Sequence, residues 1–258
     1  MNRKSKQKNA QTNRKELMSS MNNSITWTEK LDKGYWLMNL GYRDYIAARF
    51  LLNNHLIVQG LTLASTSVEK YLKALIVFNL EVREKYHYHF DKFDKLKNLL
   101  ENVNKDITKE LDPVFLEILE NAFKIRYYDR IKSPIFIGLY INQFIGELDY
   151  TIDFIERFIV NTQNGGESIS AYSRAIKNNE PHLYENNFIL NKEDKKEHME
   201  KTDVGFSIHL RMGSVSQEEN IVKGGSTKNK YEGQIARFTE FSEHLFGIHK
   251  SGDFVLKE

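Results

Sequence analysis

The sequence predicts a mainly α-helical protein: an antiparallel bundle of about five helices, followed by a small mixed α/β C-terminal extension. Three observations support this fold class. Apolar residues in the first 160 positions recur at steps of three and four, as they do on one face of a helix. Only five of the 14 glycines precede residue 161, so this stretch has few helix breakers. Near residue 205 the spacing changes to strict alternation, which is typical of a strand.

Charge and glycine content divide the chain into three parts. Residues 1–15 carry six basic side chains and no acidic one. This composition predicts a disordered basic tail over residues 1–24, which either keeps the protein soluble or attracts RNA. Residues 25–160 are expected to form the bundle, and residues 161–258 an extension whose role no motif indicates. Acidic and basic residues nearly balance in both, which does not favour a broad basic surface.

The helices of the bundle follow from the periodicity. A helical lead-in around Trp27, Leu31 and Trp36 precedes a helix over residues 42–53, whose inward side chains are expected to be Tyr45, Ile46, Phe50 and Leu52. A long helix over residues 56–79 and a last one over residues 137–160 supply the predicted core residues Val68, Leu72, Leu75, Phe144, Leu148 and Ile155.

Between these long helices the sequence predicts a polar loop and two shorter helices. The loop covers residues 80–91, and the helix after it carries Phe93, Leu96 and Leu99 on one face. Asp112 then precedes Pro113, a pairing of an N-cap residue with proline at the first helical position. We therefore expect a helix from Pro113 to near Arg130.

The extension shows one clear strand. Val204, Phe206, Ile208, Leu210 and Met212 alternate with small or polar residues, which predicts a half-buried strand over residues 204–212. A modest helix is expected near residues 169–176, and another over residues 231–246.

Composition excludes several classes of protein. With no cysteine, the chain has no disulfide, thiolate zinc site or iron–sulfur cluster. Its histidines lack the spacing of a metal site, so neither a metal nor another cofactor is expected. No apolar run is long enough to span a bilayer, and the basic N-terminus lacks the apolar stretch of a secretory signal. These features predict a cytoplasmic protein without membrane association.

Residues 68–75, which read VEKYLKAL, resemble the HEPN family of helical bundles. In this family the second helix has approximately the sequence A-x-E-K-x-L-K-A-L, and the motif H-D-L-x-x-L follows it. The approximate counterpart of the second motif here is His89-Phe90-Asp91 with Phe93 and Leu96. Arg126-Tyr127-Tyr128 matches the first two positions of the Arg-Tyr-Pro sequence that often ends the family's penultimate helix. The resemblance covers about residues 40–160.

The resemblance implies a nucleotide- or RNA-binding homodimer or heterodimer of toxin–antitoxin or phage-defence type. A nucleotidyltransferase-type antitoxin is one partner that it implies. Active family members are metal-independent endoribonucleases with an Arg-x(4–6)-His pair. In such chemistry a histidine transfers protons near neutral pH and an arginine stabilises charge on the phosphate.

Three Arg–His pairs have this spacing: Arg49–His55, Arg83–His89 and Arg237–His244. Catalytic relatives carry the motif near the start of their last helices, where this chain has Arg126 and Arg130 but no following histidine. Arg83 and His89 are therefore the candidate catalytic pair, because they lie in the polar loop. The alternative is a loop histidine beside a solvent-exposed arginine.

Further candidates for binding RNA or a nucleotide are Lys73, His87, Arg126, Tyr127 and Arg130. Lys73 either faces a phosphate or forms an ordinary surface ion pair with Glu69, four residues earlier. Arg126 and Tyr127 either contact a phosphate and a base or pack against each other at a helix end.

Two functions stay open at this point. The first is a HEPN-like protein that binds a nucleotide or RNA and acts as an endoribonuclease if the Arg–His pair is functional. The alternative is a non-catalytic helical module that pairs with a partner protein. A homodimer is expected, because the phenylalanines Phe144, Phe154 and Phe158 occupy more than one face of the last helix.

Overall fold

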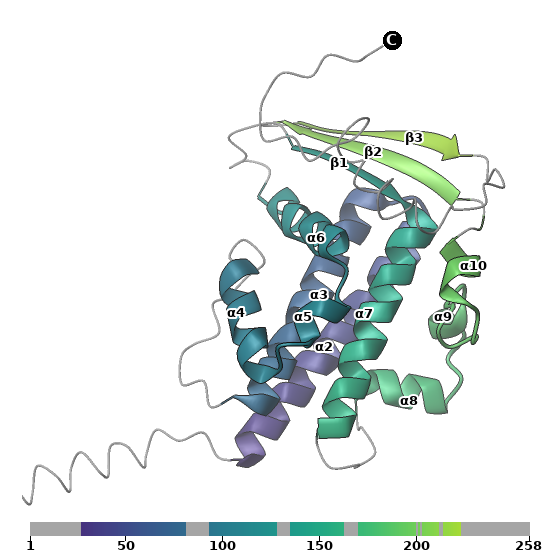
Figure 1. Cartoon of the computed structure of the whole chain (residues 1–258). Helices are drawn as coiled ribbons and strands as arrows, with labels where there is room; N and C mark the ends of the chain where they lie inside the picture. Colours follow the sequence, from purple (N-terminus) through teal and green to yellow (C-terminus); the bar gives the residue numbers. More distant parts are fainter. Residues whose placement is uncertain are drawn as a thin grey trace, which may run out of the picture.

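The computed structural model describes residues 27–80, 93–127, 135–162, 170–199, 201, 203–211 and 214–222. These residues form nine helices, α2 to α10, and one three-stranded antiparallel sheet. Three long helices lie side by side, and the sheet lies across one end of them (Figure 1). The prediction of a mainly helical protein is confirmed.

Helices α2 (Trp27–Asn53) and α3 (Ile57–Asn79) form an antiparallel hairpin. The sequence predicted a lead-in and a separate helix from residue 42, but α2 is one continuous helix of 27 residues. The glycines of α2 do not interrupt the helix; they lie where α3 packs closely against it. A Cβ atom on Gly34 would lie 2.4 Å from the Phe78 ring, and one on Gly41 would lie 2.9 Å from the Tyr71 ring.

Three shorter helices follow: α4 (Phe93–Val103), α5 (Ile107–Glu110) and α6 (Pro113–Ile125). As predicted, the Asp112 carboxylate caps α6 by accepting a hydrogen bond from the Phe115 amide at 2.6 Å, and Pro113 opens the helix. The helix ends at Ile125 instead of near Arg130. Residues 128–134 lie outside the described residues.

The start of the last long helix was predicted wrongly. Residues 137–140 belong to strand β1 (Ile135–Tyr140), and helix α7 (Ile141–Thr162) begins directly after it. The reason is pairing with a distant segment: Ile137 lies opposite Ile208 and Leu139 opposite Phe206 in the neighbouring strand. All four side chains are buried, so a partner about 70 residues later decides the conformation of this apolar run.

Strand β2 (Asp203–Arg211) is the central strand, with β1 on one side and β3 (Ser214–Val222) on the other. The predicted strand over residues 204–212 is therefore confirmed as far as Arg211, and Met212 lies outside the described residues. Phe206 packs edge-on against His55 in the turn between α2 and α3, with ring centroids 5.1 Å apart. This face of the sheet thus covers the end of the helical hairpin.

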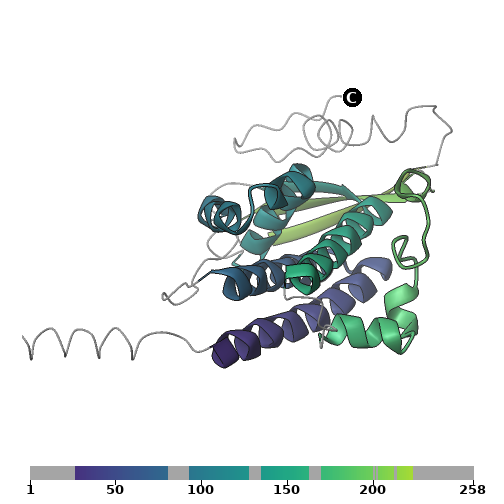
Figure 2. The ribbon, with the colours of Figure 1, turned by 60° about the horizontal axis from the view of Figure 1, so that its bottom comes forward.

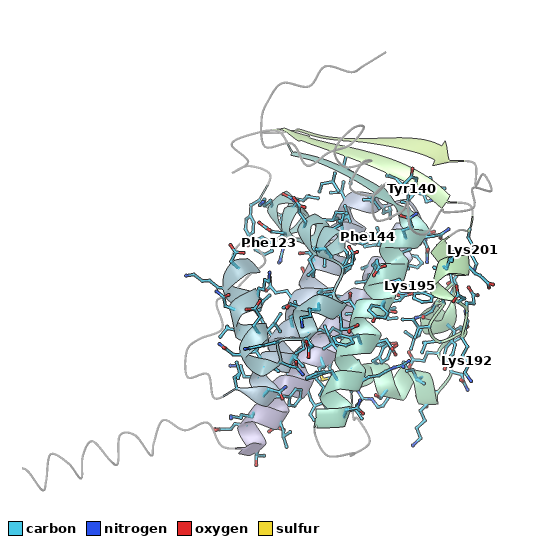
Figure 3. All side chains as sticks on the ribbon, viewed as in Figure 1. Phe123, Tyr140, Phe144, Lys192, Lys195 and Lys201 are labelled. Carbon is cyan, nitrogen blue, oxygen red and sulfur yellow. The ribbon has the colours of Figure 1, made fainter. Side chains whose placement is uncertain are left out.

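Helices α8 (Ala171–Lys177), α9 (Pro181–Tyr184) and α10 (Lys195–Met199) pack along α2 and α7 (Figure 2). The helix predicted near residues 169–176 corresponds to α8. Lys195 extends from α10 to Glu147 on α7, with a distance of 2.7 Å between Nζ and Oε1 (Figure 3). The helix predicted over residues 231–246 lies outside the described residues.

One hydrophobic core includes side chains from the hairpin, α4 to α7, α8, α9 and β2. All six predicted core residues are buried, each with at most 1% of its surface exposed. Phe144 packs against Phe115 between α6 and α7, with ring centroids 5.1 Å apart (Figure 3). Phe154 and Phe158 are partly buried against the same core, so they do not supply the free apolar face that suggested a dimer through α7.

Phe50 was expected to point inward and is instead 62% exposed. Tyr45 and Leu52 are fully buried as predicted, and Ile46 is partly buried. Helix α2 therefore has an outward apolar face in its second half, beside the segment that contains α9.

Candidate binding pocket on helix α2

Arg49 on α2 is the largest of the fully buried side chains in the described part of the protein. Its guanidinium donates from Nη1 to the Asp149 carboxylate on α7 and from Nη2 to the backbone carbonyl of Glu185. A single side chain thus joins α2, α7 and the segment after α9.

A buried polar network surrounds this ion pair. The Tyr45 hydroxyl donates to Asp149 at 2.7 Å, and the Asn187 amide donates to the Tyr45 oxygen at 3.2 Å. Burial raises the pKa of Asp149, and the Arg49 guanidinium opposes that rise. For Arg49, burial lowers the pKa but Asp149 outweighs it, and the net pKa is raised. The guanidinium therefore keeps its charge, and Asp149 balances that charge.

A pocket of about 610 Å³ opens beside Arg49, between the second half of α2 and residues 180–185. One wall is apolar and consists of Ile46, Ala47, Phe50 and Leu51. The polar lining comes from both segments and comprises Tyr42, Arg43, Arg49, Asn53, Glu180, His182 and Glu185. The volume is within the range of small-molecule sites, about 300–1,000 Å³.

Several polar groups of the lining residues have no partner among the residues that the structure describes. Arg49 Nε is buried without a hydrogen-bond partner in this part of the chain. A buried N–H without an acceptor costs about 1–3 kcal/mol. Arg43 and His182 are exposed and form no hydrogen bond or ion pair with the described part of the chain. By contrast, the Tyr42 hydroxyl fixes Glu180 by donating to its carboxylate at 3.2 Å.

Two further carboxylates on α7 anchor the same C-terminal segment. Asp153 accepts a hydrogen bond from the Tyr172 hydroxyl at 3.0 Å. Glu156 accepts from the Ser170 hydroxyl at 2.9 Å and from the Tyr71 hydroxyl at 3.0 Å. Burial raises the pKa of Glu156 to about 7, although both hydrogen bonds act to lower it. These contacts hold α8 against the bundle and so position the far wall of the pocket.

The predicted catalytic pair falls in a part of the chain that the structure does not describe. Arg83 and His89, together with the binding candidates His87 and Arg130, lie outside the described residues. Their catalytic and binding roles stay predictions. The pair Arg237–His244 also lies outside.

Lys73 is buried on α3 and donates to the Glu69 carboxylate at 2.6 Å. The ion pair expected from their spacing is present, but it is buried and not on the surface. Lys73 does not line the pocket on α2. To contact a phosphate, it would have to give up a buried ion pair, a loss that typically costs several kcal/mol.

Arg126 and Tyr127 lie at the C-terminal end of α6, and both are exposed. The Arg126 guanidinium lies 5.4 Å from the centroid of the Phe123 ring, and the Tyr127 ring lies 5.6 Å from the same ring. The structure thus shows the cation packed over an aromatic side chain. Tyr127 keeps 42% of its surface accessible, so a base could still stack on it.

Arg49 and His55, which have the spacing of the catalytic motif, lie in different surroundings. Arg49 belongs to the buried network, whereas His55 adopts a positive φ of 60° in the turn after α2 and packs on Phe206. Sequence reasoning missed Tyr42, Arg43 and His182 as site residues. Their only signal was polarity, because the pocket joins segments about 140 residues apart.

No group of His, Asp and Glu side chains in the described part of the chain has the arrangement of a metal site. Within the same residues, no helix is both long enough and apolar enough to cross a bilayer.

No family model, curated protein or solved structure matches this chain. The resemblance to the HEPN family therefore rests on the sequence motifs alone.

Proposed function

We propose that the protein binds a nucleotide or RNA and that the pocket on α2 is the binding site. The observation that carries this proposal is a pair of exposed basic side chains, Arg43 and His182, without a partner among the described residues. They lie beside an apolar wall with an exposed aromatic ring, Phe50. A guanidinium and an imidazole suit a phosphate, and an aromatic ring suits a base.

Elements far apart in sequence hold these groups in place. Arg43 and Phe50 project from the rigid helix α2, and His182 lies in α9. The Arg49 bridge to Glu185 and the Tyr42–Glu180 hydrogen bond join the two sides, so the walls are preformed. Preformed sites bind more tightly because less ordering accompanies binding.

Calorimetric titration of the full chain with nucleoside monophosphates and short single-stranded RNA tests the proposal. Replacing Arg43 or His182 with Ala should weaken binding at least fivefold, because each change removes a phosphate contact. Lys97→Ala is the matched control, since Lys97 is an exposed cation on α4 and does not line the pocket. Unchanged affinity in both pocket variants would contradict the proposal.

The resemblance to the HEPN family supports a further step, cleavage of RNA without a metal by Arg83 and His89. Incubation with RNA in EDTA, before and after His89→Ala, tests this step independently of binding. Loss of cleavage with an unchanged helical circular dichroism signal is the expected result. Cleavage that persists in the variant would exclude this pair.

A second candidate function is a helical interaction module that pairs with another protein or another copy of this chain. The observation that favours it is an outward stripe on α2: Trp36 and Phe50 are 59% and 62% exposed. Leu40, Arg43 and Ala47 lie between them at steps of three and four residues. A stripe with this spacing is typical of helix-to-helix pairing.

Light scattering at micromolar concentration separates these outcomes for the isolated protein. A dimer that Phe50→Ser dissociates would support pairing through α2. A monomer would remove the homodimer and leave the nucleotide-binding proposal unaffected.

A further inference from the structure

We propose that His198 on α10 is a pH-sensitive contact. Its neutral imidazole keeps residues 186–199 packed against the bundle, and protonation of the ring releases them. Glu185 in the far wall of the pocket lies directly before this segment, so the release also loosens the pocket. The contact acts on the conformation of the segment, whatever the pocket binds.

The His198 side chain is fully enclosed, yet it has no hydrogen-bond partner among the described residues. It has no exposed surface, and neither Nδ1 nor Nε2 forms a hydrogen bond within this part of the chain. The ring stacks instead on the buried Phe188 ring, with centroids 5.0 Å apart and an angle of 27° between the planes. A neutral imidazole has one N–H group, whereas the protonated ring has two and a positive charge. The apolar contact therefore suits the neutral ring, because protonation would bury a charge and a second N–H group.

Three charged groups act on this imidazole from the elements around it. Glu193 Oε2 lies 3.5 Å from Nδ1, too far for a strong hydrogen bond, and it already accepts from Lys201 Nζ at 2.5 Å. Asp149 on α7 favours a proton on the ring, but Arg49 already balances its charge. Burial is the largest influence on the pKa of His198. Together with Lys201 it outweighs both carboxylates, so this pKa lies below 6.5.

Protonation favours the released state, because a histidine in water binds a proton more readily than His198 does in the fold. The ordinary pKa of an imidazole is about 6.5. Between that value and the lower pKa in the fold, release of the segment takes up a proton. The equilibrium therefore moves toward release as the pH falls below about 6.5. Glu156 has the opposite effect, since its raised pKa favours the folded state at low pH.

The stacked rings are connected to the pocket through neighbouring residues. Asn187, next to Phe188, donates from its side-chain amide to the Tyr45 hydroxyl oxygen at 3.2 Å. Glu185 lies two residues before Asn187 and lines the pocket. The chain from Glu185 to Phe188 thus contacts the bundle at both ends, through the Glu185 carbonyl and through the stacked rings. Loss of the Phe188–His198 stack removes one of these attachments and increases the mobility of the pocket wall.

Hydrogen–deuterium exchange of the full chain without a ligand, at pH 7.5 and pH 5.5, tests this contact. After correction for the intrinsic exchange rates, the amides of residues 186–199 should exchange about fivefold faster at pH 5.5, and those of α3 should not. His198→Gln, which does not titrate, should abolish this difference. His182→Gln replaces an exposed histidine on α9 and is the matched control that should keep it.

His198→Phe separates the charge of the ring from its packing. It keeps an aromatic ring on Phe188 without a titratable group, so residues 186–199 should stay protected at both pH values. NMR titration of the imidazoles in the parent protein should give His198 a pKa below 6.5.

Either of two results would overturn the assignment to His198. One is a pKa of 6.5 or higher for its imidazole in the folded protein. The other is equal protection of residues 186–199 at both pH values in the parent, or a difference that persists in both His198 variants. Neither result affects nucleotide binding, which the calorimetric titration tests separately.

Discussion

Arg49 and Asp149 are 100 residues apart and form an ion pair whose side chains are 2% and 0% exposed. The pair connects α2 with α7; the Tyr45 hydroxyl also donates to Asp149, and the Glu185 carbonyl also accepts from Arg49. Because both charges are buried, each one is neutralised by the opposite charge of the other side chain.

Asp149→Ala should therefore destabilise the protein by about 3–5 kcal/mol, because it leaves a buried, unpaired guanidinium. Urea denaturation followed by circular dichroism measures the free energy of unfolding. The double variant Arg49→Met with Asp149→Leu should be less destabilised than Asp149→Ala alone, since no charge stays unpaired. A single-variant loss below 1 kcal/mol would show that the pair is not enclosed.

Glu156 should make stability fall as pH rises from about 4.5 to about 7. Its pKa is raised from 4.5 to about 7 in the folded protein, by burial and to a lesser extent by Asp153. In this window the unfolded chain releases a proton that the folded protein retains, so unfolding becomes easier with increasing pH. The contribution reaches up to roughly 3 kcal/mol. Below this window both states hold the proton, and above it neither does.

Glu156→Gln is the variant that checks this pH effect. Glutamine accepts one of the two hydrogen bonds through its amide oxygen, can donate to the other hydroxyl oxygen through its amide nitrogen, and does not titrate. Comparing the free energies of unfolding of the parent and the variant at pH 5 and pH 7.5 isolates the contribution of Glu156. Parallel stability profiles in the two proteins would refute it.

Gly34→Ala should destabilise the hairpin by about 1–3 kcal/mol through overpacking, in spite of the higher helix propensity of alanine. The new Cβ atom would lie 2.4 Å from the Phe78 ring, which is itself buried. Adding Phe78→Leu should recover part of the lost stability, because a smaller side chain makes room for the methyl group. Thermal unfolding of the single and double variants measures this recovery.

Phe50→Ser should leave the free energy of unfolding within about 0.5 kcal/mol of the parent, because the ring is 62% exposed. Phe115→Ser is the matched comparison, since Phe115 is 1% exposed and its loss should cost several kcal/mol. Urea denaturation of both variants tests the contrast. A large loss with Phe50→Ser would place this side chain in the core, as the sequence alone suggested.

The long helices could be predicted because their apolar residues repeat with the helical period over many turns. Val68, Leu72 and Leu75 are fully buried where that period placed them. Periodicity failed where a distant partner decides the structure. The apolar run IFIGLY over residues 135–140 is compatible with either a strand or a helix. Its pairing with β2 cannot be predicted from the residues next to it in sequence.

The pocket could not be predicted for a related reason. Phe50 follows the apolar period of α2, yet it faces outward, because the hairpin has only one covered side there. Asp149 and Glu156 lie among apolar residues of α7, and a pattern of hydrophobic positions assigns no role to buried carboxylates. The fold brings Arg49 and Tyr45 of α2 to Asp149, and Tyr71 and Ser170 to Glu156.

The Arg49 contacts also constrain how the chain folds as it leaves the ribosome. The α2–α3 hairpin is complete once Asn79 has been made, but the carbonyl that Arg49 requires comes 136 residues after Arg49. At about 5–20 residues per second, synthesis takes roughly 5–21 s from the end of the hairpin to Glu185. During this interval the Arg49 guanidinium and the Tyr45 hydroxyl lack part of their folded-state partners and depend on water for hydrogen bonds. The N-terminal half therefore depends on the C-terminal half for its folding, and a ribosome stalled before residue 185 would hold an incomplete bundle.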